Sequence, residues 1–398
     1  MTEIPDFAVI VLLVAGGFAL AVFSTKLTER VPLPSPALFL VGAAVASDLF
    51  PELYPHVPIL TVERIAVVAL VVILFNGGMD IGWRRFRAAA GPILSLGILG
   101  TFATAGIVAV FAHYALDFDW TLAGLVGAAL APTDPAVMFS VLGQKEIAGH
   151  SGTTLEGEAG VNDPAGIALM IGMIELATHD DATVLVIVRE FAVEMAVGTA
   201  IGIVGALLVV ALLRRVHLAV DALNPVLALA LAGALYGVTG LAHGSGFLAV
   251  FIAGLVVGDA RSPYKEEIER FHGALAGLAE IGAFVALGLV VSFGALTLRN
   301  WVEGVLLLVV LAFLARPFVV AVTLAPFSFR LNELAFLTWS GLKGAVPILL
   351  AAFAVLAEVD DARKLFDIVF VVVLVSVVGQ GTLVPWVAGA LNIPMRRV

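Results

Sequence analysis

The chain contains no cysteine among its 398 residues. This absence excludes disulfide bonds and metal sites built from thiolates. Charge is also scarce, because Asp, Glu, Lys and Arg together make up 13% of the chain, against ~25% in a typical soluble domain. The N-terminus, Met-Thr-Glu-Ile-Pro-Asp, lacks the basic segment that opens a secretory signal peptide.

Apolar sequence is abundant instead. Hydrophobic residues account for 61% of the chain, and the mean hydropathy is +1.10. This composition predicts an all-α polytopic membrane protein. Thirteen apolar segments are candidate transmembrane helices, of which the second and ninth are short and the separation of the eighth from the ninth is the least secure. They are residues 7–24, 36–50, 62–79, 92–114, 121–142, 155–177, 184–213, 222–240, 247–258, 273–295, 302–325, 332–356 and 366–391.

The charges between these segments predict an orientation. Basic residues gather in one set of alternating loops, for example at 84–87, 214–215 and 396–397, whereas the opposite loops are mainly acidic. By the positive-inside rule, the N-terminus lies outside and the C-terminus is cytoplasmic. This requires an odd number of spans. We expect a multi-pass protein of the cell (inner) membrane, with a short cytoplasmic tail at 392–398 and no soluble domain in this chain.

Two of the segments are interrupted in the middle. Residues 121–142 contain Pro132-Thr133-Asp134-Pro135, and residues 332–356 contain Gly341-Leu-Lys343-Gly-Ala-Val-Pro347. Proline removes a backbone donor and breaks a helix, and unwound backbone survives at membrane depth only where it is buried in protein or lines a cavity. The breaks lie seven segments apart, which predicts two inverted six-helix repeats with crossed discontinuous helices at a substrate site. A pair of ordinary proline kinks is the simpler alternative.

If the two breaks cross, their half-helix ends place partial charges near one point. Asp134 would then offset the positive N-terminal ends, and Lys343 would offset the negative C-terminal ends. The break also frees backbone carbonyls and the Thr133 hydroxyl to coordinate an ion.

Segment 155–177 carries Glu156, Glu158, Asn162 and Asp163, although an ionised side chain near the bilayer centre costs at least ~2.5 kcal/mol. Glu158, Asn162 and Asp163 share one helix face. A carboxylate in a half-dry cavity holds either a proton or a monovalent cation, so we expect Asp163 to be the ion carrier. Glu156 begins the segment and is a weaker candidate for the ion path.

Two other charged residues lie within apolar segments. Arg316 is the only arginine deep in an apolar segment, and we expect it to form a structural ion pair with Glu158. We expect Glu280 to pair within a helix bundle rather than to take part in transport.

These motifs resemble those of one family. Thr133-Asp134-Pro135, Glu158-x-x-x-Asn162-Asp163-Pro164 and the Gly341–Pro347 run together are similar to the monovalent cation/proton antiporters of the NhaP type. That family includes sodium/proton and potassium/proton exchangers. The end of the third segment, Phe75-Asn-Gly-Gly-Met, and Glu280-Ile-Gly-Ala-Phe are similar as well.

The resemblance implies a thirteen-helix homodimer that works by an elevator-like movement. Its dimerisation domain would comprise residues 1–80 and 222–295, its mobile core residues 92–177 and 302–391, and its linker helix residues 184–213. The resemblance also places the ion-binding aspartate on Asp163, the unwound Thr-Asp pair on Thr133 and Asp134, and the structural pair on Glu158 and Arg316.

Three positions bear on mechanism and selectivity. Asn162 stands where the electrogenic branch of the family has a second aspartate, which resembles the electroneutral branch. Lys343 replaces the family's usual arginine, and Ala159 replaces a common serine, so one hydroxyl ligand is missing. The choice among Na⁺, K⁺ and Li⁺ therefore stays open.

The functional prediction is a transporter rather than an enzyme, with no catalytic residues and no cofactor. It would exchange Na⁺ (or K⁺) for H⁺, with Asp163 and Thr133 as the expected cation ligands. Its partners would be these ions, the lipid bilayer and a second copy of the chain, and not nucleic acid. The alternatives are a sodium-coupled symporter of an organic acid, and a channel or membrane sensor.

Overall fold

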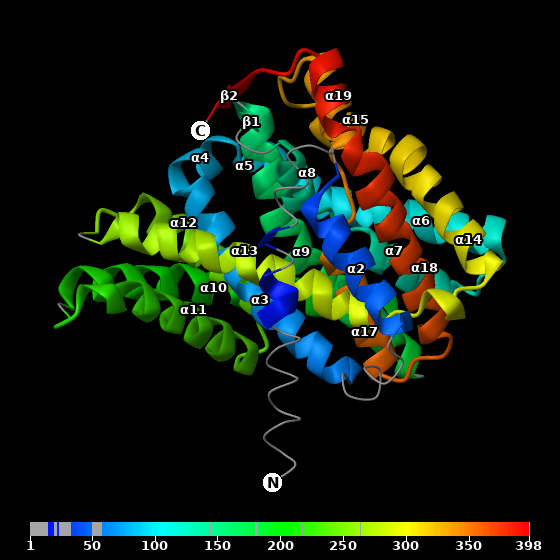
Figure 1. The fold of residues 1–398 in the computed structure, drawn as a ribbon, viewed down its shortest axis with the longest axis horizontal. Helices are drawn as coiled ribbons and strands as arrows, with labels where there is room; N and C mark the ends of the chain where they lie inside the picture. The colour runs from blue at the N-terminus through cyan, green and yellow to red at the C-terminus, as the bar shows by residue number, and fades with distance from the viewer. Residues whose placement is uncertain are drawn as a thin grey trace, which may run out of the picture.

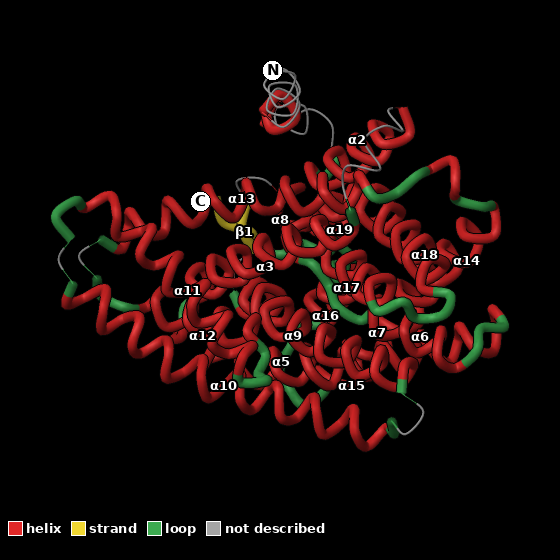
Figure 2. Tube along the Cα trace, turned by 90° about the horizontal axis from the view of Figure 1, so that it is seen from below, coloured by secondary structure: helices red, strands yellow, loops and turns green. Residues whose placement is uncertain are grey.

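The computed structural model describes residues 15–19, 22–23, 33–49, 58–142, 145–147, 149–179, 182–216, 218–262 and 264–397, and almost all of these are helical (Figures 1 and 2). One small sheet accompanies the helices. Strands β1 (Lys145–Ile147) and β2 (Met395–Arg397) pair antiparallel, with Glu146 opposite Arg396. Pairing two short segments satisfies backbone groups that neither could satisfy alone. Most of the first predicted segment, 7–24, lies outside the described residues.

The helices of the first half follow the predicted segments closely. Residues 90–116 form one continuous helix with a π-helical turn, and residues 131–134 separate α7 from α8. The bounds are α2 Ser35–Leu49, α3 Ile59–Ile81, α4 Trp83–Ala88, α5 Ala90–Leu94, η2 Ser95–Leu99, α6 Gly100–Leu116, α7 Trp120–Leu130, α8 Pro135–Leu142, α9 His150–Thr178 and α10 Val184–Arg215.

In the second half, the insecure separation of 222–240 from 247–258 is present as a tight turn between two helices. The bounds are η3 Asp221–Leu223, α11 Asn224–Leu241, α12 Gly246–Asp259, α13 Lys265–Leu289, η4 Phe293–Ala295, α14 Leu298–Val310, η5 Leu311–Ala315, α15 Arg316–Leu324, α16 Leu331–Trp339, α17 Ala345–Leu356, α18 Ala362–Val375, η6 Ser376–Gln380 and α19 Val384–Ala390.

The tenth predicted segment, 273–295, is displaced along the chain, because α13 begins at Lys265 and ends at Leu289. Its first turns are polar, and an apolar-run criterion overlooks them. After the helix has ended, Ser292 Oγ and Gly294 N donate hydrogen bonds to the carboxylate of Asp48.

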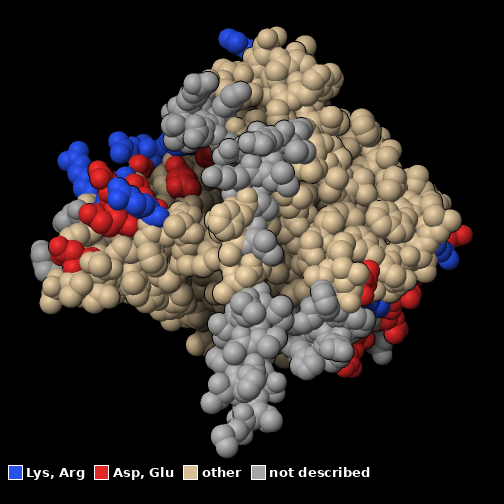
Figure 3. All heavy atoms as spheres, in the orientation of Figure 1, with Lys and Arg blue, Asp and Glu red and all other residues tan. Residues whose placement is uncertain are grey.

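Six described helices are long and apolar enough to cross a membrane, or seven if α18–η6 and the bent α19 count as one span. α2, α7, α12 and α17 are shorter apolar helices. On the face drawn in Figure 3, charged side chains gather at two opposite ends, and the surface between them is largely uncharged. This distribution suits a chain whose middle lies in hydrocarbon.

Two groups of helices enclose the centre. α3 packs against α12 and α13, with α2, α10 and α11 around them, while α7 and α9 pack with α6, α17 and α18 (Figure 1). α9 and α17 also contact α3, and α17 contacts α13, so the two groups meet along these helices. Close approach of α3 and α12 depends on glycine: a Cβ at Gly254 would lie 2.3 Å from the carbonyl oxygen of Phe75.

Candidate functional site

The two interrupted helices meet at their breaks. α7 ends at Leu130 and α8 begins at Pro135, while α16 ends at Trp339 and α17 begins at Ala345. The backbone N–H of Asp134 donates to the carbonyl of Leu342 across the junction, at 2.9 Å. This bond satisfies backbone groups that the broken helices cannot satisfy internally.

Lys343 supplies the positive charge at this junction. Its buried ammonium donates to the carbonyl oxygens of Ala131 and Pro132, at 3.1 and 2.9 Å, where α7 has just ended. Those carbonyls carry the negative end of the α7 dipole. The backbone N–H of Lys343 donates to Ser376 Oγ at 3.0 Å, which ties the second break to η6.

Asp134 lies at the N-terminal end of a helix, whereas the ammonium of Lys343 lies at the C-terminal end of one. Its carboxylate sits against Gly344, the residue directly before α17, where a dipole presents its positive end. A Cβ at position 344 would lie 1.8 Å from Asp134 Oδ2, so only glycine leaves room for this carboxylate. The two breaks therefore place one acidic and one basic side chain at helix ends of the complementary sign.

Glu158 and Arg316 form a buried bidentate ion pair. Arg316 Nη1 donates to Glu158 Oε1 at 2.5 Å, and Nη2 donates to Oε2 at 2.8 Å. The guanidinium also donates to the carbonyl of Leu337. The π-helical turn η5 directly precedes Arg316, and Gly341 lets the guanidinium approach, because a Cβ there would lie 2.6 Å from its Nε.

Thr133 and Asn162 extend this pair into a hydrogen-bonded chain. The Asn162 amide donates to Thr133 Oγ1 at 2.8 Å, and the Thr133 hydroxyl donates to Glu158 Oε1 at 3.2 Å. Neither residue lines the cavity described below. The structure thus places two of the expected ion-binding residues beside the Glu158–Arg316 pair.

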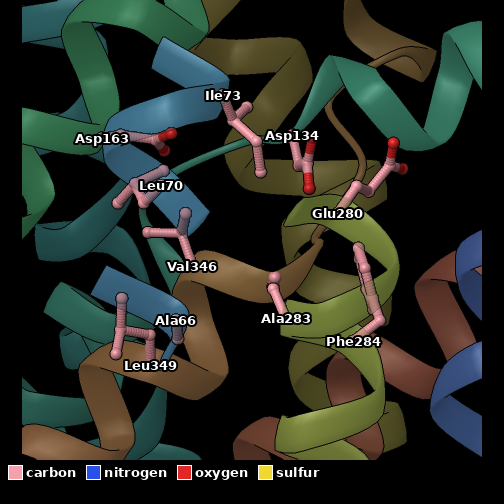
Figure 4. Close-up of a pocket in the computed structure, with 11 residues that line it drawn as sticks. Ala66, Leu70, Ile73, Asp134, Asp163, Glu280, Ala283, Phe284, Val346 and Leu349 are labelled. Atoms are coloured by element: carbon pink, nitrogen blue, oxygen red, sulfur yellow. The ribbon is translucent and has the colours of Figure 1, made fainter. Parts of the chain in front are cut away.

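Asp163 lines a cavity of about 40 Å³. A water molecule needs roughly 10–15 Å³ by the same measure, so the space holds a few waters or a small ion. Asp163 is 6% exposed, and its Oδ1 has no hydrogen-bond partner among the described residues. The wall is otherwise mostly apolar, and it is lined by Ala66, Leu70, Ile73, Asp134, Asp163, Glu280, Ala283, Phe284, Ala345, Val346 and Leu349 (Figure 4).

Glu280, for which the sequence predicts pairing within a helix bundle, also lines the cavity. Its Oε1 is buried and has no hydrogen-bond partner among the described residues. In the sequence, Glu280 lies in the middle of an apolar stretch from Gly273 to Leu287. This stretch, about two helical turns on either side of Glu280, contains no basic residue. That isolation was the available signal, because an unpaired carboxylate at membrane depth is costly unless it faces water or an ion.

Two remaining candidates lie away from the cavity wall. Glu156 pairs with Arg85 of α4, whose Nη2 lies 3.1 Å from Glu156 Oε2. Ala159 is buried in α9 and does not line the cavity. Among the described residues, no three His, Asp or Glu side chains lie close enough to hold one metal ion together.

Comparison with known proteins gives consistent results. The family model described as "Sodium/hydrogen exchanger, transmembrane" matches residues 9–390. The K⁺/H⁺ antiporter NhaP of Alkalimonas amylolytica is 36% identical over 93% of this chain and 65% of its own length. The K⁺/H⁺ antiporter NhaP2 of Shewanella sp. (strain ANA-3) is 32% identical over 91% of this chain and 63% of its own. The chain thus spans just under two thirds of these relatives.

A solved structure has the same fold. The sodium proton antiporter MjNhaP1 of Methanocaldococcus jannaschii at pH 8 superposes with a TM-score of 0.81, over 97% of this chain and 99% of that one. Its sequence identity to this chain is 21%. At this identity the likeness concerns the fold.

Proposed function

The chain belongs to the sodium/hydrogen exchanger family, and from that premise we propose that it exchanges a monovalent cation for protons across a cell membrane. The observation that carries the proposal is Asp163, a buried carboxylate that lines an ion-sized cavity and keeps one oxygen without a hydrogen-bond partner among the described residues. Such a group binds a proton or a cation in turn. This alternation is sufficient for exchange if the group reaches the two sides of the membrane one after the other.

The residues around the breaks and on α9 have supporting roles in the proposal. We assign Glu158 and Arg316 to a structural ion pair, with Thr133 and Asn162 extending it toward Asp163. Lys343 and Asp134 compensate the ends of the broken helices. With one carrier carboxylate, each cycle moves one cation against one proton, so the exchange is electroneutral.

The moving parts follow the two groups of helices. In the proposed elevator movement, a core of residues 92–177 and 302–391 carries Asp163 past a dimerisation domain of residues 1–80 and 222–295, with 184–213 as linker. Thirteen spans, an outer N-terminus, a cytoplasmic C-terminus and a homodimer complete the proposal. It is supported by the position of the cavity, whose wall combines α9 and α17 with α3 and α13.

The transported cation is Na⁺ or K⁺. The two curated relatives are named as K⁺/H⁺ antiporters, and the structural neighbour is named as a sodium proton antiporter. A sodium-coupled organic acid symporter is not favoured, because a cavity of about 40 Å³ has no room for an organic acid.

The test is an exchange assay in proteoliposomes with an imposed pH gradient and an internal pH probe. Adding Na⁺, K⁺ or Li⁺ in separate runs should dissipate the gradient with at least one of them. Asp163→Asn should abolish dissipation, because an amide holds neither a proton nor a cation in the same way. Asp360→Asn, the same change on an exposed residue, is the control. A gradient that persists with every alkali ion contradicts the proposal.

A further inference from the structure

The cavity at Asp163 has an acidic group on its opposite wall. Glu280 comes from α13, whereas Asp163 comes from α9 and Asp134 from the break between α7 and α8. In the view of Figure 4, the carboxylates of Asp134 and Glu280 lie next to one another, and Asp163 lies on the other side of Ile73. Glu280 also interacts electrostatically with Asp134.

The other groups on this wall do not neutralise Glu280. The cavity residues that α3, α13 and α17 contribute besides Glu280 are alanine, leucine, isoleucine, valine and phenylalanine. Lys343 does not line the cavity, and its ammonium donates to the carbonyls of Ala131 and Pro132. The cavity therefore gathers three acidic side chains in an apolar enclosure, where each carboxylate, once ionised, attracts a cation far more strongly than in water.

We propose that Glu280 is the affinity-determining residue of the exchange site: a carboxylate on the α13 wall that attracts the alkali cation toward Asp163. Glu280 does not replace Asp163 as carrier. It lies on the group of helices that, in the proposed elevator movement, stays still while α9 moves. In the position of this structure, Asp163 lines the same cavity as Glu280.

The inference rests on the proposed exchange function and makes a separate claim about it. An ordinary structural role for Glu280 would show as a loss of folded protein or of maximal rate. An electrostatic role in cation capture shows as a rise in the KM for the cation while the maximal rate is kept. The charge matters in this role, so Gln should behave differently from Asp.

The experiment measures cation-dependent dissipation of a pH gradient by the full chain in proteoliposomes, at alkaline pH where protons compete least. Titrations of Na⁺ and K⁺ are run separately on wild type, Glu280→Gln and Glu280→Asp. The matched control is Glu269→Gln, the same substitution on the same helix at a partly exposed residue that pairs with Lys265. Size-exclusion profiles in detergent establish that each variant is folded.

For Glu280→Gln we expect the KM for the cation to rise roughly tenfold, since one charge is lost from a low-dielectric wall, while the maximal rate stays within about twofold. Glu280→Asp should bring the KM back to within about threefold of wild type. If Glu280→Gln is not recovered folded, Glu280→Ala and Glu280→Asp are compared in the same way.

Two results would overturn the inference. One is a KM for Glu280→Gln that is the same as the KM of wild type and of Glu269→Gln. The other is complete loss of exchange, as for Asp163→Asn, which would make Glu280 an obligatory or purely structural group. Failure of wild type to exchange any alkali ion would instead overturn the proposed function itself, so the two failures are distinguishable.

Discussion

At the scale of single residues, the chemistry of the site depends on which polar atoms are occupied. The Asn162 amide, the Thr133 hydroxyl and the Arg316 guanidinium are all engaged around Glu158. Asp163 retains an oxygen without a hydrogen-bond partner. Two carboxylates separated by one helical turn and one residue therefore have different surroundings. One is paired with the Arg316 guanidinium, and the other is the group that we propose to bind the exchanging cation.

The buried pair gives a stability prediction. Arg316→Met removes the counter-charge and leaves Glu158 buried and unpaired, which should lower the free energy of unfolding by about 3–5 kcal/mol. The double variant Glu158→Gln, Arg316→Met should recover part of that loss, because no uncompensated charge remains. Thermal unfolding of the purified protein in detergent measures both. A single variant as stable as wild type would show that the pair contributes little.

At the scale of helices, glycine and proline decide where the backbone breaks and where helices touch. Pro132 and Pro135 bracket the first break, and Gly344 makes space for Asp134 in the second. The α3–α12 contact also depends on glycine. A Cβ at Gly78 would lie 3.0 Å from the Cα of Gly254, and a Cβ at Gly254 would lie 3.1 Å from the Cα of Gly78. These contacts hold the wall from which Glu280 and α3 face the cavity.

A substitution in that contact should separate the two helices. Gly254→Leu places a side chain against the carbonyl of Phe75, and overpacking of this kind costs typically about 1–3 kcal/mol. The expected outcome is a lower thermal midpoint together with weaker cation-dependent exchange. Gly237→Leu on α11, where nothing lies within 4 Å, is the control and should leave both unchanged. Equal midpoints for the two variants would contradict a close α3–α12 contact.

The helices and the breaks could be predicted because their causes are local. Apolar length, Pro132 and Gly344 are visible in the sequence without knowing any neighbour. What a side chain faces, by contrast, depends on how its helix packs against others, and this cannot be read from the neighbouring sequence. Glu280 was expected to pair within a bundle, and only the packing of α13 against α3 and α17 places it in the cavity. Likewise, Thr133 was expected to face an ion, and the structure bonds its hydroxyl to Glu158.

At the scale of the whole molecule, the cavity lies where the two groups of helices meet. Its wall takes residues from α3 and α13 on one side and from α9, α17 and the first break on the other. A relative movement of the two groups would change what Asp163 faces. Together with Asp163, this arrangement supports the proposal of a carrier that serves the two membrane faces in turn.

Proton and cation compete for one carboxylate in this scheme, which predicts the pH dependence of the exchange. As pH falls, protons occupy Asp163 more often, so the KM for Na⁺ or K⁺ should rise. In the range where Asp163 is mostly protonated, the rise approaches about tenfold per pH unit by mass action. Initial rates in proteoliposomes across a pH series at several cation concentrations measure it. A KM independent of pH would mean that proton and cation occupy separate groups.

The second break, residues 340–344, also bears on how the sequence can change over evolutionary time. Irregular segments usually lie at the surface and accept substitutions readily. This one is enclosed: Gly341 touches the Arg316 guanidinium, and Gly344 touches the Asp134 carboxylate. Any side chain at either position displaces a charged group from its partner. Substitutions at these two glycines should therefore be accepted as rarely as in a folded core, although the backbone here has the shape of a loop.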